Sequence, residues 1–145
     1  MLKSPLRMVL VAVAVSLASC AKDESLSALP ASDRVIVGQL KSELVTGEIA
    51  EPSSVSRLLQ FANSQRQKPW SSEQVVHSQC SLSFTFMVGA NRIGYIALDA
   101  NAFFSSGGLG QAQRPASPQE VQAFLALVPS ALLPEPFKQG KCKLP

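Results

Sequence analysis

Three cysteines and one histidine have the most distinctive chemistry in this 145-residue chain. Cys20 lies near the start, and Cys80 and Cys142 lie 142 − 80 = 62 positions apart. A cysteine thiol can be lipidated, oxidised to a disulfide or bound to a metal ion. A histidine can act as a general base or as a metal ligand. The residues around each side chain indicate which of these chemistries applies.

Cys20 directly follows a segment with the organisation of an export signal. Lys3 and Arg7 come first, an apolar run covers residues 8–17, and small residues occupy positions 18–19. A basic start, an apolar middle and small residues before a cleavage point are typical of signal peptides. The apolar run is about half as long as the ~20 residues that a membrane-spanning helix needs. We therefore expect a cleaved signal rather than a retained span.

The sequence Leu17-Ala18-Ser19-Cys20 resembles the lipobox of bacterial lipoproteins. The resemblance implies cleavage before Cys20, thioether lipidation of its sulfur and acylation of its new amine. It divides the chain into a signal peptide at residues 1–19, a lipidated cysteine with its tether at residues 20–33, and a single periplasmic domain at residues 34–145.

The mature chain would hold 145 − 19 = 126 residues, which suits one domain with one core. Its tether is small, polar and interrupted by Pro30. Ala21, which is not Asp, favours the outer membrane by analogy with lipoprotein sorting. The net charge of +3 includes Lys3 and Arg7, so the mature chain carries about +1. This charge provides no field for nucleic acid, and we expect no nucleic-acid partner.

Cys80 and Cys142 form an even pair in an exported chain, and an oxidising periplasm favours one disulfide between them. This bond would hold the proline-rich tail against the domain. Two free thiols or a metal-binding pair are the alternatives. A zinc site needs four ligands, and His77 is the only histidine, so we expect no metal ion and no other cofactor.

His77 is also a candidate general base, and Asp99 could orient it if the fold brought the two together. No G-x-S-x-G nucleophile motif is present, and one carboxylate does not suit glycoside hydrolysis. We therefore expect a surface histidine, an aspartate that forms a turn, and no catalytic residue. The glycine-rich residues 105–111 lack the lysine of a phosphate-binding loop and predict a surface loop. Three lysines near the C-terminus are expected to solvate the tail: Lys138, Lys141 and Lys143.

Hydrophobic periodicity predicts an α+β domain, with a small antiparallel sheet of one strand plus a central hairpin packed with two helices. Residues 80–88 alternate between apolar and polar, and residues 93–98 form the returning strand. One predicted helix follows Pro52, and the other opens with a capping box from Ser117. Residues 34–40 fit either a strand or a helix, and their β-branched side chains favour the strand.

The body also resembles a kind of small, uncharacterised bacterial envelope domain. The resemblance covers about 80 residues, and it supports the order of elements without implying any activity. The matching segments are residues 49–52, 58–63, Trp70, Gly94, 101–104, 114–117 and Glu120.

These features favour a non-enzymatic, outer-membrane-anchored lipoprotein that faces the periplasm and binds an unidentified protein or cell-wall partner. A specific version is an immunity or inhibitor protein that neutralises a toxin or a hydrolase. One alternative is an accessory or assembly lipoprotein, similar to a secretion pilot, that serves an envelope machine. An envelope hydrolase is the other alternative.

Overall fold

The computed structural model describes residues 24–72, 76–107 and 110–143, so the expected signal peptide and Cys20 lie outside the described residues. Within this part, one seven-stranded sheet has the order β2-β1-β4-β5-β6-β7-β3, and all neighbouring strands are antiparallel. The strands are β1 (Arg34–Gly38), β2 (Val45–Ile49), β3 (Ser71–Ser72), β4 (Ser81–Val88), β5 (Asn91–Asp99), β6 (Ala102–Gly107) and β7 (Gly110–Pro115).

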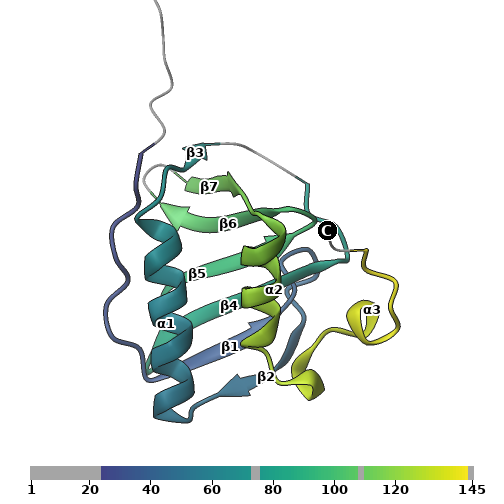
Figure 1. Ribbon diagram of the computed structural model, residues 1–145. Coiled ribbons are helices and arrows are strands. Elements are labelled where there is room, and N and C mark those ends of the chain that lie inside the picture. The colour runs from purple at the N-terminus through teal and green to yellow at the C-terminus, as the bar shows by residue number, and fades with distance from the viewer. Residues whose placement is uncertain (1–23, 73–75, 108–109, 144–145) are drawn as a thin grey trace, which may run out of the picture.

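Two longer helices, α1 (Pro52–Arg66) and α2 (Pro118–Ala126), lie side by side across one face of the sheet (Figure 1). A 3₁₀ turn (Ser130–Leu132) and α3 (Glu135–Lys138) follow in the tail. The α+β class is confirmed, but the expected sheet of one strand plus a hairpin was too small. No helix in the described part combines the length and the apolar character needed to cross a bilayer.

The β4–β5 hairpin forms the middle of the sheet and confirms the predicted alternation. Phe84 and Phe86 of β4 are fully buried beneath the helices. The ring of Phe84 lies 4.6 Å from that of Phe124 on α2, centroid to centroid. Gly89, in the two-residue turn between the strands, has φ +57°, a left-handed conformation that glycine adopts readily. The hairpin and α2 therefore share one hydrophobic core.

Residues 34–38 form β1, which confirms the preferred strand over the alternative helix. The neighbouring edge strand β2 was not predicted, because a run of Val-Thr-Gly-Glu-Ile has weak alternation. Gly47 of β2 lies against the side chain of Leu132, where a Cβ atom would approach Cδ2 to 2.3 Å. The tail thus packs closely against β2, and a side chain at position 47 would have to displace that of Leu132.

The expected surface loop at residues 105–111 was wrong, because most of this segment belongs to the β6–β7 hairpin. The polar side chains of the hairpin have specific partners across the sheet's helix-covered face. Arg66 of α1 donates to the Ser105 hydroxyl at 2.6 Å, and Arg114 of β7 donates to Gln65 at 2.5 Å. Polar strands of this kind give no hydrophobic signal in the sequence.

Both helices begin with side-chain caps. Glu51 caps α1, since its carboxylate accepts hydrogen bonds from the backbone N–H groups of Ser53 and Ser54. Hydrogen bonds from Ser54 and Ser53 lower the pKa of Glu51 to about 2. The predicted capping box of α2 is confirmed, since Ser117 and Glu120 each accept from the other's backbone N–H.

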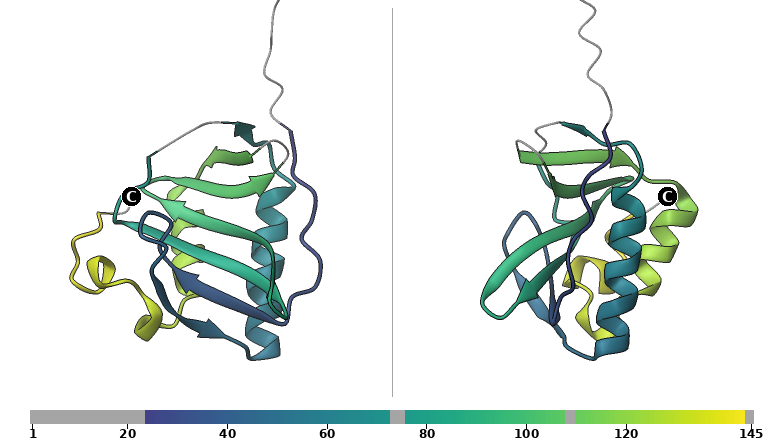
Figure 2. Two further views of the ribbon diagram at one scale, coloured as in Figure 1. Left: turned by 180° about the vertical axis from the view of Figure 1, so that it is seen from behind. Right: turned by 90° about the vertical axis from the view of Figure 1, so that its left-hand side faces the viewer.

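None of the helices in the described part of the chain lies on the face of the sheet opposite α1 and α2 (Figure 2). Residues 24–33 form an extended segment, here called the strap, that runs beside α1 before the chain enters β1 (Figure 1). A tether was expected as far as residue 33, but from Glu24 onward this stretch is packed against the domain. Leu29 of the strap is buried in the core that the helices share with the sheet.

Candidate functional site

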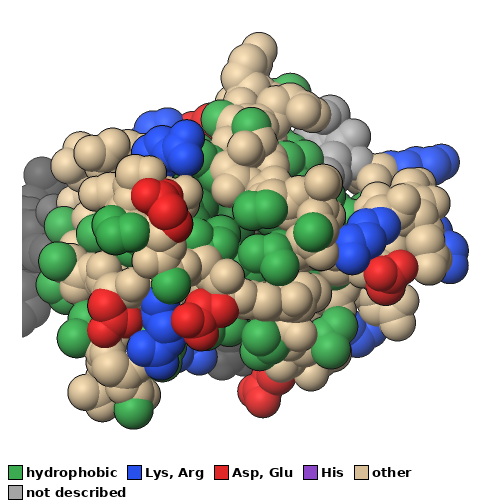
Figure 3. Space-filling view, turned by 90° about the horizontal axis from the view of Figure 1, so that it is seen from below, with side chains coloured by type: hydrophobic (Ala, Val, Ile, Leu, Met, Phe, Trp, Pro, Cys, Tyr) green, Lys and Arg blue, Asp and Glu red, His purple; other side chains and the backbone are tan. Residues whose placement is uncertain are grey.

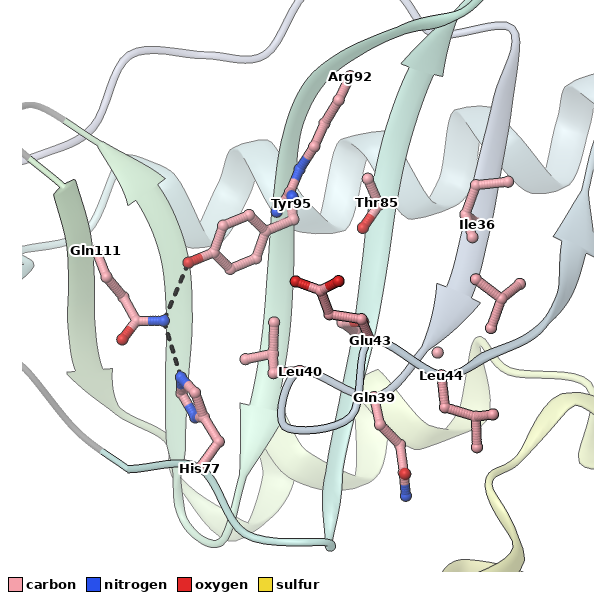
Figure 4. A pocket seen from close by; sticks show the side chains of 13 residues that line it. Ile36, Gln39, Leu40, Glu43, Leu44, His77, Thr85, Arg92, Tyr95 and Gln111 are labelled. Carbon is pink, nitrogen blue, oxygen red and sulfur yellow. Dashed lines mark hydrogen bonds between the residues drawn. The ribbon is translucent and has the colours of Figure 1, made fainter.

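The helix-free face of the sheet holds a hollow of about 460 Å³ (Figure 4). Ligand sites commonly have volumes of about 300–1,000 Å³. The hollow lies over β1, β4 and β5, and the β1–β2 loop and the segment before β4 form its walls. Its lining residues are Ile36, Gly38, Gln39, Leu40, Glu43, Leu44, Val45, His77, Ser83, Thr85, Arg92, Tyr95 and Gln111.

The β1–β2 loop folds back over the sheet and is held there by hydrogen bonds. Gln39 donates from its side chain to the Gln79 carbonyl at 2.8 Å, and the Leu40 N–H donates to the Ser81 hydroxyl at 3.1 Å. Leu40 also packs against the second apolar cluster, which includes Tyr95 and Phe104. The loop is therefore a fixed wall of the hollow.

A chain of polar side chains forms the opposite wall. The Asp99 carboxylate lies 3.2 Å from His77 Nδ1, and the Gln111 amide nitrogen lies 2.9 Å from His77 Nε2. The same Gln111 nitrogen donates to the Tyr95 hydroxyl at 3.1 Å (Figure 4). The ring of Phe104 meets the edge of the His77 ring at 4.6 Å between centroids. His77 is thus held in one orientation from three sides.

The geometry fits a neutral His77 whose Nδ1–H donates to Asp99 and whose Nε2 accepts from Gln111. Asp99 is also fixed by the segment before β4, because it accepts from the Ser78 N–H at 2.8 Å and from the Ser78 hydroxyl at 2.5 Å. An oriented His–Asp pair is one part of a nucleophilic triad. The described residues that hydrogen-bond to the His77 ring are Asp99 and Gln111, and neither is a serine, threonine or cysteine.

Charged and apolar side chains line the rest of the hollow. Arg92 lies over the Tyr95 ring, with its guanidinium carbon 4.8 Å from the ring centroid. Glu43 extends from the β1–β2 loop over the sheet (Figure 4). Leu44 and Val45 are 49% and 60% exposed at the rim beside the edge strand β2. A ligand would meet hydrogen-bonding groups on one side of the hollow and apolar side chains on the other.

The remaining predicted residues lie elsewhere. The Sγ atoms of Cys80 and Cys142 are 2.19 Å apart and their Cα atoms are 5.4 Å apart, which joins the tail to the residue before β4. Lys138 lies 3.5 Å from Glu135 on the exposed tail. Within residues 24–72, 76–107 and 110–143, no three metal-binding side chains of the His, Cys, Asp or Glu type cluster together.

The sequence singled out His77 and Asp99 and left their pairing to the fold, which brings them together. The expected surface histidine is mostly covered, with 13% of its side chain exposed. Tyr95 and Gln111 were missed. Tyr95 could have been placed, because alternation along β5 puts it on the same face as Ala97 and Asp99. Gln111 could not, because its segment was read as a loop. Comparisons with protein-family models, curated proteins and solved structures find no match to this chain.

Proposed function

We propose that this protein is a lipid-anchored module of the bacterial cell envelope that binds a protein or cell-wall partner through the hollow. The lipobox at Leu17-Ala18-Ser19-Cys20 supports the anchor, and Ala21 supports the outer membrane facing the periplasm. The observation that carries the binding role is the convergence of His77, Gln111 and Tyr95 on one wall of a hollow with an apolar rim.

The anchor is tested by the substitution Cys20→Ser. A diacylglyceryl group plus an N-acyl chain holds a protein at the bilayer far more firmly than a single chain. We expect the variant to leave the membrane pellet or to remain unprocessed, and the wild type to sediment with outer membranes. A Cys20→Ser variant that still sediments fully processed with membranes would contradict the anchor.

The binding role is tested by photo-crosslinking in living cells from an amino acid placed at Leu44, on the rim. The matched control position is Gln122, which is exposed on α2 on the opposite side of the sheet. We expect an adduct from position 44 that disappears when Thr85→Trp fills the hollow. An equal adduct from position 122, or an adduct unaffected by Thr85→Trp in a folded protein, would count against the hollow.

An immunity or inhibitor protein is the specific form that suits this role, because such a protein needs a preformed surface and no turnover. An accessory or pilot-like lipoprotein would use the same hollow, and the identity of the crosslinked partner separates the two. A toxin or hydrolase in the adduct favours the inhibitor, and a component of an envelope machine favours the accessory protein.

The His77–Asp99 pair favours a hydrolase as the second candidate function. A substrate or water would then have to displace Gln111 from His77 Nε2 to use it as a general base. The test is His77→Gln, with the folded state checked by its melting temperature. The readout is whether His77→Gln reproduces the growth or envelope defect of cells that lack the protein. A reproduced defect together with an intact Leu44 adduct would support hydrolysis, and no defect would exclude a catalytic role for His77.

A further inference from the structure

The strap fixes the place at which the chain enters the domain. Glu24 and Trp70 exchange backbone hydrogen bonds of 3.1 and 3.0 Å, and the Leu26 N–H donates to the Arg66 carbonyl at 2.7 Å. These contacts hold the start of the strap against the segment that leaves the C-terminal end of α1. The entry point therefore lies beside β3, at one end of the molecule (Figure 1).

Two side chains of α1 hold the middle of the strap. Arg66, which is 3% exposed, donates to the Ser27 carbonyl at 2.6 Å and to the Ser106 carbonyl at 2.8 Å. Asn63 accepts from the Leu29 N–H at 2.7 Å and donates to the Leu29 carbonyl at 3.1 Å. Residues 26–29 of the strap are thus hydrogen-bonded to α1 rather than merely resting on its surface.

Two glycines of the sheet make room for the strap's leucines. A Cβ atom on Gly107 would lie 2.4 Å from Leu26 Cδ2, and a Cβ atom on Gly94 would lie 2.5 Å from Leu29 Cδ2. A larger residue at either position would have to displace these leucine side chains. The sheet, the helix and the strap therefore fit together as one rigid body from Glu24 onward.

The chain between the proposed anchor and this rigid body is short. From Cys20 to Glu24 there are four residue steps, which reach about 14 Å when fully extended. Helix α1, with 15 residues, is by itself about 22 Å long. A connection shorter than the domain cannot let the domain turn over relative to its anchor.

We propose that the end of the domain formed by Glu24, Trp70 and β3 rests against the lipid bilayer, with β2 and the start of α1 directed away from it. This inference rests on the proposed lipidation of Cys20. The distal end, which Figure 3 shows from below, carries interspersed acidic, basic and hydrophobic side chains. The hollow then opens sideways, with Gln111 on its membrane side and Val45 on its distal side.

The orientation can be measured on vesicles with the mature chain. Cys80 and Cys142 are joined, so Cys20 is the remaining thiol and couples to a maleimide lipid. A fluorescent amino acid replaces Ser72 on β3 or, as the matched distal position, Ala50 before α1; both are exposed. Headgroup-linked quencher lipids report the distance from the bilayer. We expect stronger quenching at position 72 than at position 50.

A ten-residue Gly-Ser insertion before Glu24 is the control, because a chain of about 14 residues spans roughly 20 Å on average. It should abolish the difference between the two positions while leaving the fold intact. Equal quenching at both positions without the insertion would overturn the orientation. The vesicle experiment attaches Cys20 to lipid chemically, so its result does not depend on whether cells lipidate Cys20. Finding no lipid on Cys20 in protein made in cells would overturn the proposed anchor and leave the measured orientation unaffected.

Discussion

Asp99 shows how one buried carboxylate organises the wall of the hollow. It is 7% exposed, and its oxygens accept from the Ser78 N–H, from the Ser78 hydroxyl and, in the tautomer described, from His77. All three donors come from the segment before β4, so Asp99 helps to hold this segment over the sheet. Asp99 was expected to form a local turn, but its carboxylate instead joins segments 21 and 22 positions apart.

Replacing Asp99 tests this role. Asp99→Ala leaves the donors of Ser78 without an acceptor, and we expect a loss of about 2–3 kcal/mol in the free energy of unfolding. Hydrogen exchange should increase at residues 76–80, where the lost bonds lie. The exposed Glu135→Ala variant is the control and should change stability little. An unchanged exchange rate at Ser78 would show that Asp99 does not hold this segment.

Phe84 and Ser83 are neighbours on opposite faces of β4. Phe84 is fully buried against Phe124, so Phe84→Ala should cost about 3–5 kcal/mol through lost burial and the cavity left behind. Ser83 faces the hollow, and Ser83→Ala should cost well under ~1 kcal/mol. Urea unfolding of both variants measures the difference. Similar losses would mean that the two faces have been assigned wrongly.

Glu120 links α2 to both its neighbours, because its carboxylate bonds to Lys68 after α1, to Arg114 of β7 at 3.2 Å and to the Ser117 N–H at 2.8 Å. Burial raises its pKa, but the hydrogen bonds from Lys68 and Ser117 and the charge of Arg114 outweigh burial and lower the pKa to about 2. The ordinary value is 4.5. The carboxylate is therefore stabilised in the folded state.

A lowered pKa means that Glu120 contributes stability above pH 4.5, and that this contribution disappears as the pH falls toward 2. We expect Glu120→Gln to be less stable than the wild type at pH 6 and to approach it near pH 2. Chemical unfolding across this range gives the comparison. Gln119→Ala, an exposed change in the same turn, should preserve the wild-type pH dependence. A gap between Glu120→Gln and the wild type that does not shrink on acidification would exclude the proposed linkage.

The elements that the sequence predicted are those whose local signals agree with their packing. The capping box at Ser117 and the alternation of β4 each combine a local rule with burial on one face. The β6–β7 hairpin and β2 carry no such pattern, since long-range partners such as Arg66 and Leu132 stabilise them. The His77–Asp99 pair was unpredictable for the same reason: nothing local brings the segment before β4 back over the sheet.

The disulfide joins the C-terminal tail to Cys80, the residue before β4 in the middle of the chain. The loop-entropy model assigns about 4 kcal/mol to a bond between residues 62 positions apart. We expect no titratable thiol at Cys80 or Cys142 in protein taken from the periplasm. Cys142→Ser should lower the free energy of unfolding by up to about 4 kcal/mol and increase hydrogen exchange in α3. Free thiols in unfolded, unreduced protein would show that the bond does not form in cells.

The long-range contacts of the strap also determine how early the domain can fold. It pairs with Trp70 and with Arg66, about 40 positions further along the chain, and Arg66 in turn reaches Ser106. β1 cannot pair until β4 has emerged, and Phe84 of β4 is covered by α2, which lies near the C-terminal end of the domain. A chain exported from its N-terminus thus cannot close its core until its last third has emerged. If Cys20 is lipidated as proposed, we therefore expect its lipidation to precede folding, and chains truncated before α2 to be degraded by envelope proteases.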